Sequence, residues 1–246
     1  MEKKKITPDR KKEGAGANIY RLFPSSDTNH LDPFVLFDEF MVEPDKGFPM
    51  HKHAGFEAIT YIIEGEFRHR DDLGNDSIVG KNGIQKFTAG KGIEHSEMPE
   101  GDEKTHGFQL WVNLPRGKKN VEPNYERIQS EYLPETKDGK ARIRTIIGEV
   151  SPVNLETTIV YQDINLEKNS FTSIDIPEQY NGFLYVYAGE IIIETNEKDM
   201  NVSHREGFIF EDGERVSIGS DSESKIIVLS GQPIGDDIRL EGSVVR

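Results

Sequence analysis

The sequence predicts an all-β protein that is built from two tandem β-barrels and has few, short helices. Short runs of β-branched and aromatic residues recur along the chain, with turn-forming residues between them. Strands at this spacing, with few helical patterns, are typical of sandwiches and barrels. The runs include 58–63, 108–112 and 226–229, and the turns include 73–76 and 81–83. A helix is expected only within 122–132.

A short internal repeat indicates that the barrel is duplicated. Residues 61–67 resemble residues 185–191 at an offset of 124 positions. Each copy contains two glycines 18 positions apart, Gly65 with Gly83 and Gly189 with Gly207. Because a hairpin with the same glycine spacing occurs twice, the chain is expected to contain two copies of one β unit.

The boundary between the two copies is expected at residues 134–139. This stretch reads Pro-Glu-Thr-Lys-Asp-Gly, which has the composition of a linker. We therefore expect residues 1–135 to form an N-terminal barrel and residues 136–246 to form a C-terminal barrel.

Composition excludes several classes of function. The formal net charge is −14, so direct nucleic-acid binding is not expected, because phosphate recognition depends on Lys and Arg. No apolar run approaches the length of a membrane span. Cysteine is absent, which excludes disulfides and thiolate metal sites. The basic N-terminus is not followed by the apolar stretch of a secretory signal, so a cytoplasmic protein is expected.

Two pairs of residues at alternate positions are the candidate metal ligands. His51 and His53 flank Lys52, and His95 and Glu97 follow the Gly-Lys-Gly turn at 90–92. Side chains at i and i+2 of a strand share one face, with Cα atoms about 7 Å apart. Each pair can therefore face one ion, and two such pairs on neighbouring strands supply three nitrogens and one carboxylate.

This ligand set suits one divalent transition metal. Fe(II), Ni, Mn, Cu and Zn accept imidazole and carboxylate, whereas Ca and Mg prefer all-oxygen sites. Four protein ligands in an octahedron leave two positions for water, dioxygen or substrate. Under the 124-residue offset His51 and His53 correspond to Asp175 and Pro177, so the second copy is expected to bind no metal.

Glu57 and the remaining histidines are the alternatives. Glu57 has the same strand parity as His51 and His53, so it can also face inward, as a rival ligand, a carboxylate beside the ligands or a general base. The other histidines have no partner at ligand spacing and are expected to be hydrogen-bonded or solvated; they are His30, His69, His106 and His204.

The blocks that carry these residues resemble the pirin family of bicupins. Residues 51–57, His-Lys-His-Ala-Gly-Phe-Glu, are similar to the family's His-Pro-His-Arg-Gly-Phe-Glu. Residues 64–75 resemble its next strand and turn, and residues 88–99 and 106–115 are the most specific blocks. The resemblance is strong over about residues 14–135 and weak beyond them.

The resemblance implies two tandem cupin-type (jelly-roll) barrels. It places Fe(II) in the N-terminal cupin, held by the residues that match His51, His53, His95 and Glu97, and it makes the C-terminal cupin degenerate and metal-free. It also implies a quercetinase-type (flavonol 2,3-) dioxygenase, with a small flavonol-like aromatic substrate and dioxygen. Glu97 or Glu57 would take the hydroxyl proton of the substrate.

Two other functions stay open at this point. Some relatives are non-enzymatic, iron-containing regulators whose redox state sets the surface that they present to a protein partner. A metal-bound isomerase or a small-molecule binding cupin is the third alternative, because the cupin fold hosts many chemistries.

Two departures from the family bear on access to the site. Lys52 and Ala54 stand where the family has Pro and Arg, so charge and rigidity at the mouth of the site are expected to differ. The tail ends at Arg246, which is shorter than in typical members, so the segment that closes the site is expected to be missing.

Overall fold

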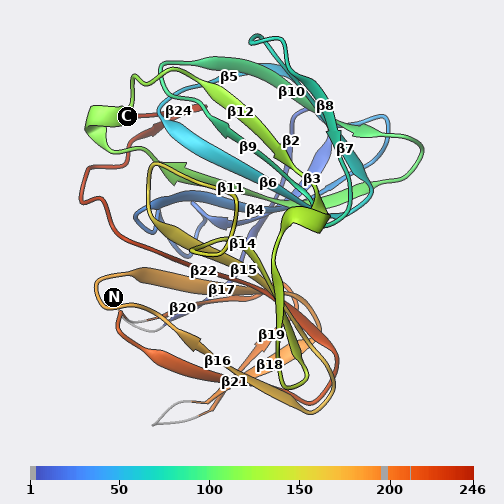
Figure 1. Ribbon diagram of the computed structural model, residues 1–246, viewed down its shortest axis with the longest axis vertical. Coiled ribbons are helices and arrows are strands. Elements are labelled where there is room, and N and C mark those ends of the chain that lie inside the picture. Colours follow the sequence, from blue (N-terminus) through green and yellow to red (C-terminus); the bar gives the residue numbers. More distant parts are fainter. Residues whose placement is uncertain (1–3, 195–198, 211) are drawn as a thin grey trace. The chain divides into compact units, whose positions relative to one another are not determined.

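The computed structural model describes residues 4–194, 199–210 and 212–246, and it is nearly all β-structure, as predicted. The chain forms two compact units (Figure 1). The N-barrel comprises residues 9–132, 155–157 and 234–246. The C-barrel comprises the chain up to Pro8 together with residues 133–154 and 158–233. A single cut at 135/136 therefore does not describe the two units, because the N-barrel also contains residues 155–157 and 234–246 and the C-barrel also contains the chain up to Pro8.

Two antiparallel sheets and a terminal hairpin form the N-barrel. The larger sheet has the order β12-β9-β6-β11-β4-β3-β2, the smaller has the order β5-β10-β7-β8, and β23 pairs with β24. The elements are β2 (Asp9–Glu13), β3 (Ala17–Phe23), β4 (Phe34–Val42), β5 (Phe48–His53), β6 (Phe56–Glu64), β7 (Glu66–Asp71), β8 (Asp76–Val79), β9 (Ile84–Thr88), β10 (Ile93–Glu100), β11 (Thr105–Asn113), β12 (Asn124–Ile128), β23 (Leu240–Glu241) and β24 (Val244–Val245), with the 3₁₀ turns η1 (Arg116–Lys118) and η2 (Ser130–Tyr132).

The C-barrel has sheets of the same two sizes. Their orders are β1-β20-β17-β22-β15-β14-β13 and β16-β21-β18-β19. The strands are β1 (Lys4–Ile6), β13 (Glu135–Asp138), β14 (Ala141–Ile147), β15 (Ile159–Leu166), β16 (Ser170–Asp175), β17 (Asn181–Ala188), β18 (Glu190–Glu194), β19 (Met200–Ser203), β20 (Gly207–Phe210), β21 (Arg215–Ser220) and β22 (Ser224–Gly231).

The repeat in the sequence is a repeat in the structure. β6 pairs with β9 in the N-barrel, and β17 pairs with β20 in the C-barrel. The turns that follow β6 and β17 contain Gly65 and Gly189, whose φ angles are 76° and 73°. Glycine tolerates this left-handed region at little cost, which explains why both turns contain it. The prediction of two tandem barrels is confirmed.

The two interiors differ in what fills them. One continuous cluster of apolar side chains fills the C-barrel; it comprises Ala141, Ile164, Leu166, Ile174, Ile176, Leu184, Val186, Ile191, Ile193, Val202, Phe208, Phe210, Val216, Ile218, Ile226 and Val228. The N-barrel interior includes two smaller apolar clusters, one around Phe40 and Phe67 and one around Phe56 and Phe87. Buried polar side chains, including three histidines, share the N-barrel interior.

Two local expectations are wrong. Residues 122–132 form no α-helix, because β12 pairs with β9 and only η2 follows it. Residues 134–139 are not an open linker, because β13 pairs with β14 across a tight turn at Gly139, whose φ of 57° suits a short hairpin loop. Among the residues that the structure describes, no helix has the length and apolar composition that crossing a membrane requires.

The last residues of the chain dock on the N-barrel through the start of β6. The backbone N–H of Val245 donates to the carbonyl of Ala54 at 2.9 Å, and Ala54 and Val244 form a parallel bridge. Gly55 follows with φ of 84°, and a Cβ at this position would lie 2.0 Å from the carbonyl oxygen of Val245. The close approach of the hairpin therefore requires glycine at position 55.

We predict that Gly55→Ala destabilises the protein more than Gly74→Ala does, by about 1–3 kcal/mol, the usual cost of overpacking. Gly74 is the matched control, because its φ is 94° but a Cβ there would meet nothing within 4 Å. Both variants carry the same kind of backbone strain, so the difference between their urea midpoints measures contact with the hairpin. Equal destabilisation would contradict this packing.

Candidate metal centre

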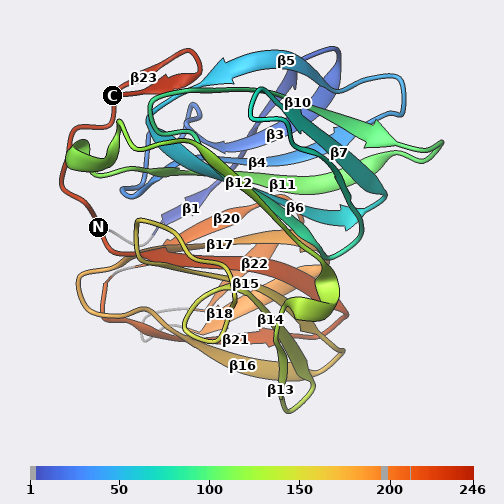
Figure 2. The ribbon, with the colours of Figure 1, turned by 45° about the horizontal axis from the view of Figure 1, so that its top comes forward.

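Three histidines from two neighbouring strands meet inside the N-barrel. The strands β5 and β10 are neighbours (Figure 2). β5 carries His51 and His53, and β10 carries His95 directly opposite His51. The ring centroids of His51 are 4.5 Å from those of His53 and 4.6 Å from those of His95. One nitrogen from each ring lies within 4.8 Å of the others. The geometry that i, i+2 spacing predicted for His51 and His53 is therefore present, with a third imidazole facing the pair.

Backbone carbonyls fix the first two rings. Nδ1 of His51 lies 2.7 Å from the carbonyl oxygen of Pro49, and Nδ1 of His53 lies 3.2 Å from that of Ser243. A carbonyl can only accept, so Nδ1 carries the proton in both rings and donates it. The Nε2 lone pair of each ring is left available, which is the form in which neutral histidine binds a metal.

His95 supplies the observation that most directly indicates a metal. Its side chain is fully buried, and its Nε2 has no hydrogen-bond partner among the described residues. A buried polar atom without a partner costs about 1–3 kcal/mol. A cation held between His51, His53 and His95 would satisfy this nitrogen, so the side chains present fit a metal ion.

The two buried rings do not repel a cation by their own charge. Burial, with a smaller contribution from neighbouring His51, lowers the pKa of His53 to about 3. Burial also lowers the pKa of His95 well below its ordinary value, with smaller contributions from His53 and His51. Both rings are therefore neutral at physiological pH, and neutral imidazole is a ligand for transition metals.

Glu97 lies beside His95 but is displaced from the other two rings. A register shift separates His95 from Glu97 on β10, and the carboxylate shares a ligand-sized cluster with His95 and His69 rather than with His51 and His53. The hydroxyl of Thr60 donates to Glu97 at 2.7 Å. Burial raises the pKa of Glu97 to about 7, although the bond from Thr60 opposes the rise.

A cavity of about 570 Å³ opens beside these groups. His51, His53 and Glu97 line it, so the candidate ligands are reachable. Its wall is otherwise largely apolar and includes Ile19, Leu36, Phe40, Phe48, Met50, Trp111 and Leu240. Pockets of this size and character are typical of small-molecule sites.

His69 lies beside this cluster of histidines, where the sequence analysis did not place it. It is fully buried on β7, and its Nδ1 lies 3.4 Å from Nδ1 of His95. β7 pairs with β10 on the side away from β5, and the register sets His69 opposite Glu97. The sequence contains one signal for it, because His69 and Asp71 repeat the i, i+2 pattern of the two ligand pairs.

Glu57 lies in a different environment from the one that its parity predicted. Its carboxylate accepts hydrogen bonds from Thr88 at 2.9 Å and from the backbone of Glu156 at 2.8 Å, and Lys86 lies 3.6 Å away. Gly55 lies in the turn between β5 and β6. The alternation of side chains along β5 therefore does not predict which way Glu57 of β6 points. Phe56, rather than Glu57, contacts the ring of His53.

The remaining histidines fit the prediction. His30 bonds the carbonyl of Val35, and His106 bonds the carboxylate of Glu39. His204 is exposed.

Lys52 and Ala54 do not border the candidate ligands. Lys52 lies on the exposed face of β5, with Glu94 at 3.9 Å. Ala54 lines a second cavity that contains none of the metal-ligand candidates. The expectation that these two residues shape the mouth of the site is wrong, because alternation along the strand turns both away from His51 and His53.

The site also has a closing segment. Leu240, Gly242 and Ser243 of the terminal hairpin line the cavity, and Ser243 holds the ring of His53. The expectation that the tail lacks such a segment is therefore wrong.

Comparison with known proteins gives the family of both halves of the chain. The family model described as Pirin matches residues 16–112, and the one described as Pirin C-terminal cupin domain matches residues 161–246. The Pirin-like protein 2 of Arabidopsis thaliana is 34% identical over 98% of this chain and 78% of its own length.

Solved structures show the same fold. A quercetin 2,3-dioxygenase from Acinetobacter baumannii is similar with a TM-score of 0.87, at 24% identity over 98% of this chain and 90% of its own. The bacterial pirin YhhW from Escherichia coli, solved in complex with nickel(II), has a TM-score of 0.76 at 20% identity, over 94% of this chain and 100% of its own.

We predict that His51→Ala and His95→Ala each abolish retention of the metal and leave the fold intact, because the barrel core is apolar packing. His204→Ala is the control, since His204 is exposed and lies in the C-barrel. Elemental analysis of protein purified without an affinity tag, together with circular dichroism, checks both points. One equivalent of metal in both His51→Ala and His95→Ala would show that the ligand assignment is wrong.

Proposed function

The chain belongs to the pirin family, and from this membership and the geometry of the N-barrel we propose that it is a metal-dependent dioxygenase of the quercetinase type. The metal would be held by His51, His53 and His95 with Glu97 as the fourth ligand. Fe(II) is the first candidate, followed by Ni, Mn, Cu and Zn. The substrate would be a small, flat aromatic molecule that carries an acidic hydroxyl, as a flavonol does.

One observation carries this proposal: two of the three clustered histidines border a cavity large enough for a substrate. A purely structural metal would be closed off by its ligands. Here two of the three histidines and the carboxylate line an accessible cavity of about 570 Å³. Because a small molecule can reach the candidate ligands from this cavity, the site favours an enzyme. In a purely regulatory protein, the metal could be fully enclosed and act only by changing the protein surface.

The lining residues suit an aromatic molecule with polar substituents. Trp111 and Phe48 offer ring faces, and burial of an aromatic plane against them excludes water. Arg21 also lines the cavity, held in place by a bidentate pair with buried Asp38 at 2.8 and 2.7 Å. Gln109 adds an amide beside Thr60. These polar groups can orient substrate oxygens.

Glu97 is the group that we assign to proton transfer. It lines the cavity beside the histidines, so its carboxylate can reach a hydroxyl group of a substrate held there. The metal, when bound, supplies Lewis-acid stabilisation of an oxyanion and redox chemistry with dioxygen. We assign no proton transfer to Glu57, because its carboxylate is engaged by Thr88, Lys86 and the backbone of Glu156.

We predict that protein loaded with iron bleaches quercetin in air and not under nitrogen. Absorbance at the flavonol band and oxygen uptake measure the reaction, and the His95→Ala variant is the control for metal in solution. The absence of bleaching with each of Fe, Ni, Mn and Cu would remove the quercetinase proposal. A specific protein partner retained in only one iron oxidation state would then favour the regulatory alternative.

A second prediction separates catalysis from metal binding. Leu36 is buried at the cavity wall, so Leu36→Trp is expected to fill the cavity while leaving the ligands in place. Turnover should fall about tenfold or more, which corresponds to about 1.4 kcal/mol, with metal content unchanged. Leu73→Trp, at an exposed turn, is the matched control. Full activity in Leu36→Trp would show that the cavity is not the substrate site.

A further inference from the structure

A chain of three buried polar side chains leads away from the candidate ligands on the far side of β10. His95 Nδ1 lies 3.4 Å from His69 Nδ1, and His69 Nε2 lies 3.0 Å from Asp71 Oδ2. The side chains of His69 and Asp71 are both fully buried. This chain of side chains, Asp71–His69–His95, ends at the unpartnered Nε2 of His95.

The carboxylate of Asp71, at the far end of this row of side chains, is held in place by the turn between β7 and β8. Asp71 Oδ1 accepts the backbone N–H groups of Leu73 and Asn75, at 3.0 and 2.9 Å. The side-chain amide of Asn75 donates to Oδ2 at 2.8 Å. Because several donors hold this carboxylate, its Oδ2 has one orientation to offer His69.

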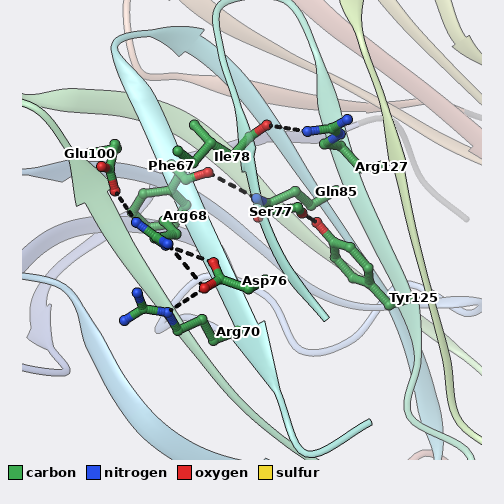
Figure 3. A network of polar contacts seen from close by, with 10 residues as sticks. All are labelled: Phe67, Arg68, Arg70, Asp76, Ser77, Ile78, Gln85, Glu100, Tyr125 and Arg127. Carbon is green, nitrogen blue, oxygen red and sulfur yellow. Dashed lines mark hydrogen bonds and ion pairs between the residues drawn. The ribbon is translucent and has the colours of Figure 1, made fainter. Parts of the chain in front are cut away.

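The ring of His69 is held in the orientation that its contacts with His95 and Asp71 require. Its ring stacks on Tyr125 with centroids 4.0 Å apart and planes 12° apart. The hydroxyl of Tyr125 bonds Ser77 of β8, as Figure 3 shows. On the outward face of the same strands, Arg68 and Arg70 both pair with Asp76 (Figure 3). Alternation along β7 thus places ion pairs outside and the His69–Asp71 pair inside.

These contacts determine where the protons lie. An ionised carboxylate only accepts, so Nε2 of His69 carries a proton and donates it to Asp71. Nδ1 of neutral His69 then has a lone pair, and Nδ1 of His95 carries the proton that points to it. The remaining lone pair of His95 is on Nε2, which faces His51 and His53.

We propose that Asp71 and His69 are positioning residues that hold His95 in the Nδ1–H tautomer, with its Nε2 lone pair directed at the metal. The inference rests on the proposed metal centre. His69 is assigned no bond to the metal, although its ring lies close enough to His95 and Glu97 to belong to a ligand-sized cluster. Its two nitrogens are engaged by His95 and Asp71.

Two variants test whether Asp71 and His69 position His95. Asp71→Asn keeps the size of the side chain but presents an N–H to His69, which would reverse the tautomers of both rings. His69→Phe keeps the stack on Tyr125 but removes the acceptor for His95. His106→Phe is the matched control, because His106 also bonds a buried carboxylate, Glu39, in the same barrel. Cobalt(II) binding to metal-free protein, measured against a competing chelator, gives the affinity of each variant.

The affinity for cobalt is expected to fall about 10- to 100-fold in Asp71→Asn and His69→Phe, the usual effect of losing the partner of a ligating histidine. One equivalent should still bind at saturation, and His106→Phe should bind as the wild type does. Unchanged affinity in both variants would overturn the positioning role. A change in the cobalt absorption bands of His69→Phe that matches the loss of a nitrogen ligand would also overturn it, since His69 would then be a ligand.

Nitrogen NMR of the metal-free protein tests the tautomer independently of metal. His95 is expected to be protonated at Nδ1 in the wild type and at Nε2 in Asp71→Asn. A wild-type His95 protonated at Nε2 would overturn the inference. If the tautomers are as expected but the wild type binds no transition metal, the proposed function fails and the hydrogen-bonded chain stands, so the two failures are distinguishable.

Discussion

The antiparallel register of β10 against its two neighbours is the constraint on which the site depends. On one side it sets His95 opposite His51, and on the other it sets Glu97 opposite His69. A slip of one residue in either pairing would turn every inward side chain of a strand to the other face. The ligand atoms, the cavity and the hydrogen-bonded chain behind His95 are therefore all consequences of one set of backbone pairings.

The polar groups at this site are oriented before any ion is present. Each of the three rings has its Nδ1 engaged, by the carbonyl of Pro49, by the carbonyl of Ser243 and by His69. This arrangement leaves His95 with a buried, unpartnered nitrogen, which costs about 1–3 kcal/mol. A bound cation would give this nitrogen a partner and remove the cost. The free-energy difference therefore favours the protein with metal bound over the metal-free protein. The C-barrel contains the duplicated scaffold, but apolar side chains fill its interior.

Local sequence patterns predicted the features that are determined within a single strand. They failed where the chain turns and where side chains from different strands meet. Alternation predicted that His51 and His53 share a face, and the repeated glycine spacing predicted the second barrel. Parity failed for Glu57 because Gly55 bends the chain between two strands. It held for His95 and Glu97, which share the buried face of β10. His69 was missed because His95, which it contacts, lies on the neighbouring strand. The return of the terminal hairpin to the N-barrel leaves no trace in local patterns.

The account of function rests on three imidazole nitrogens that share one metal beside an apolar cavity. X-ray absorption of the iron-loaded protein at the iron edge tests this most directly, because imidazole rings give a characteristic outer-shell scattering. The account predicts iron in a shell of nitrogen and oxygen with scattering from three histidine rings, and no bound iron in His95→Ala. Iron surrounded by oxygen alone, with no scattering from histidine rings, would contradict it.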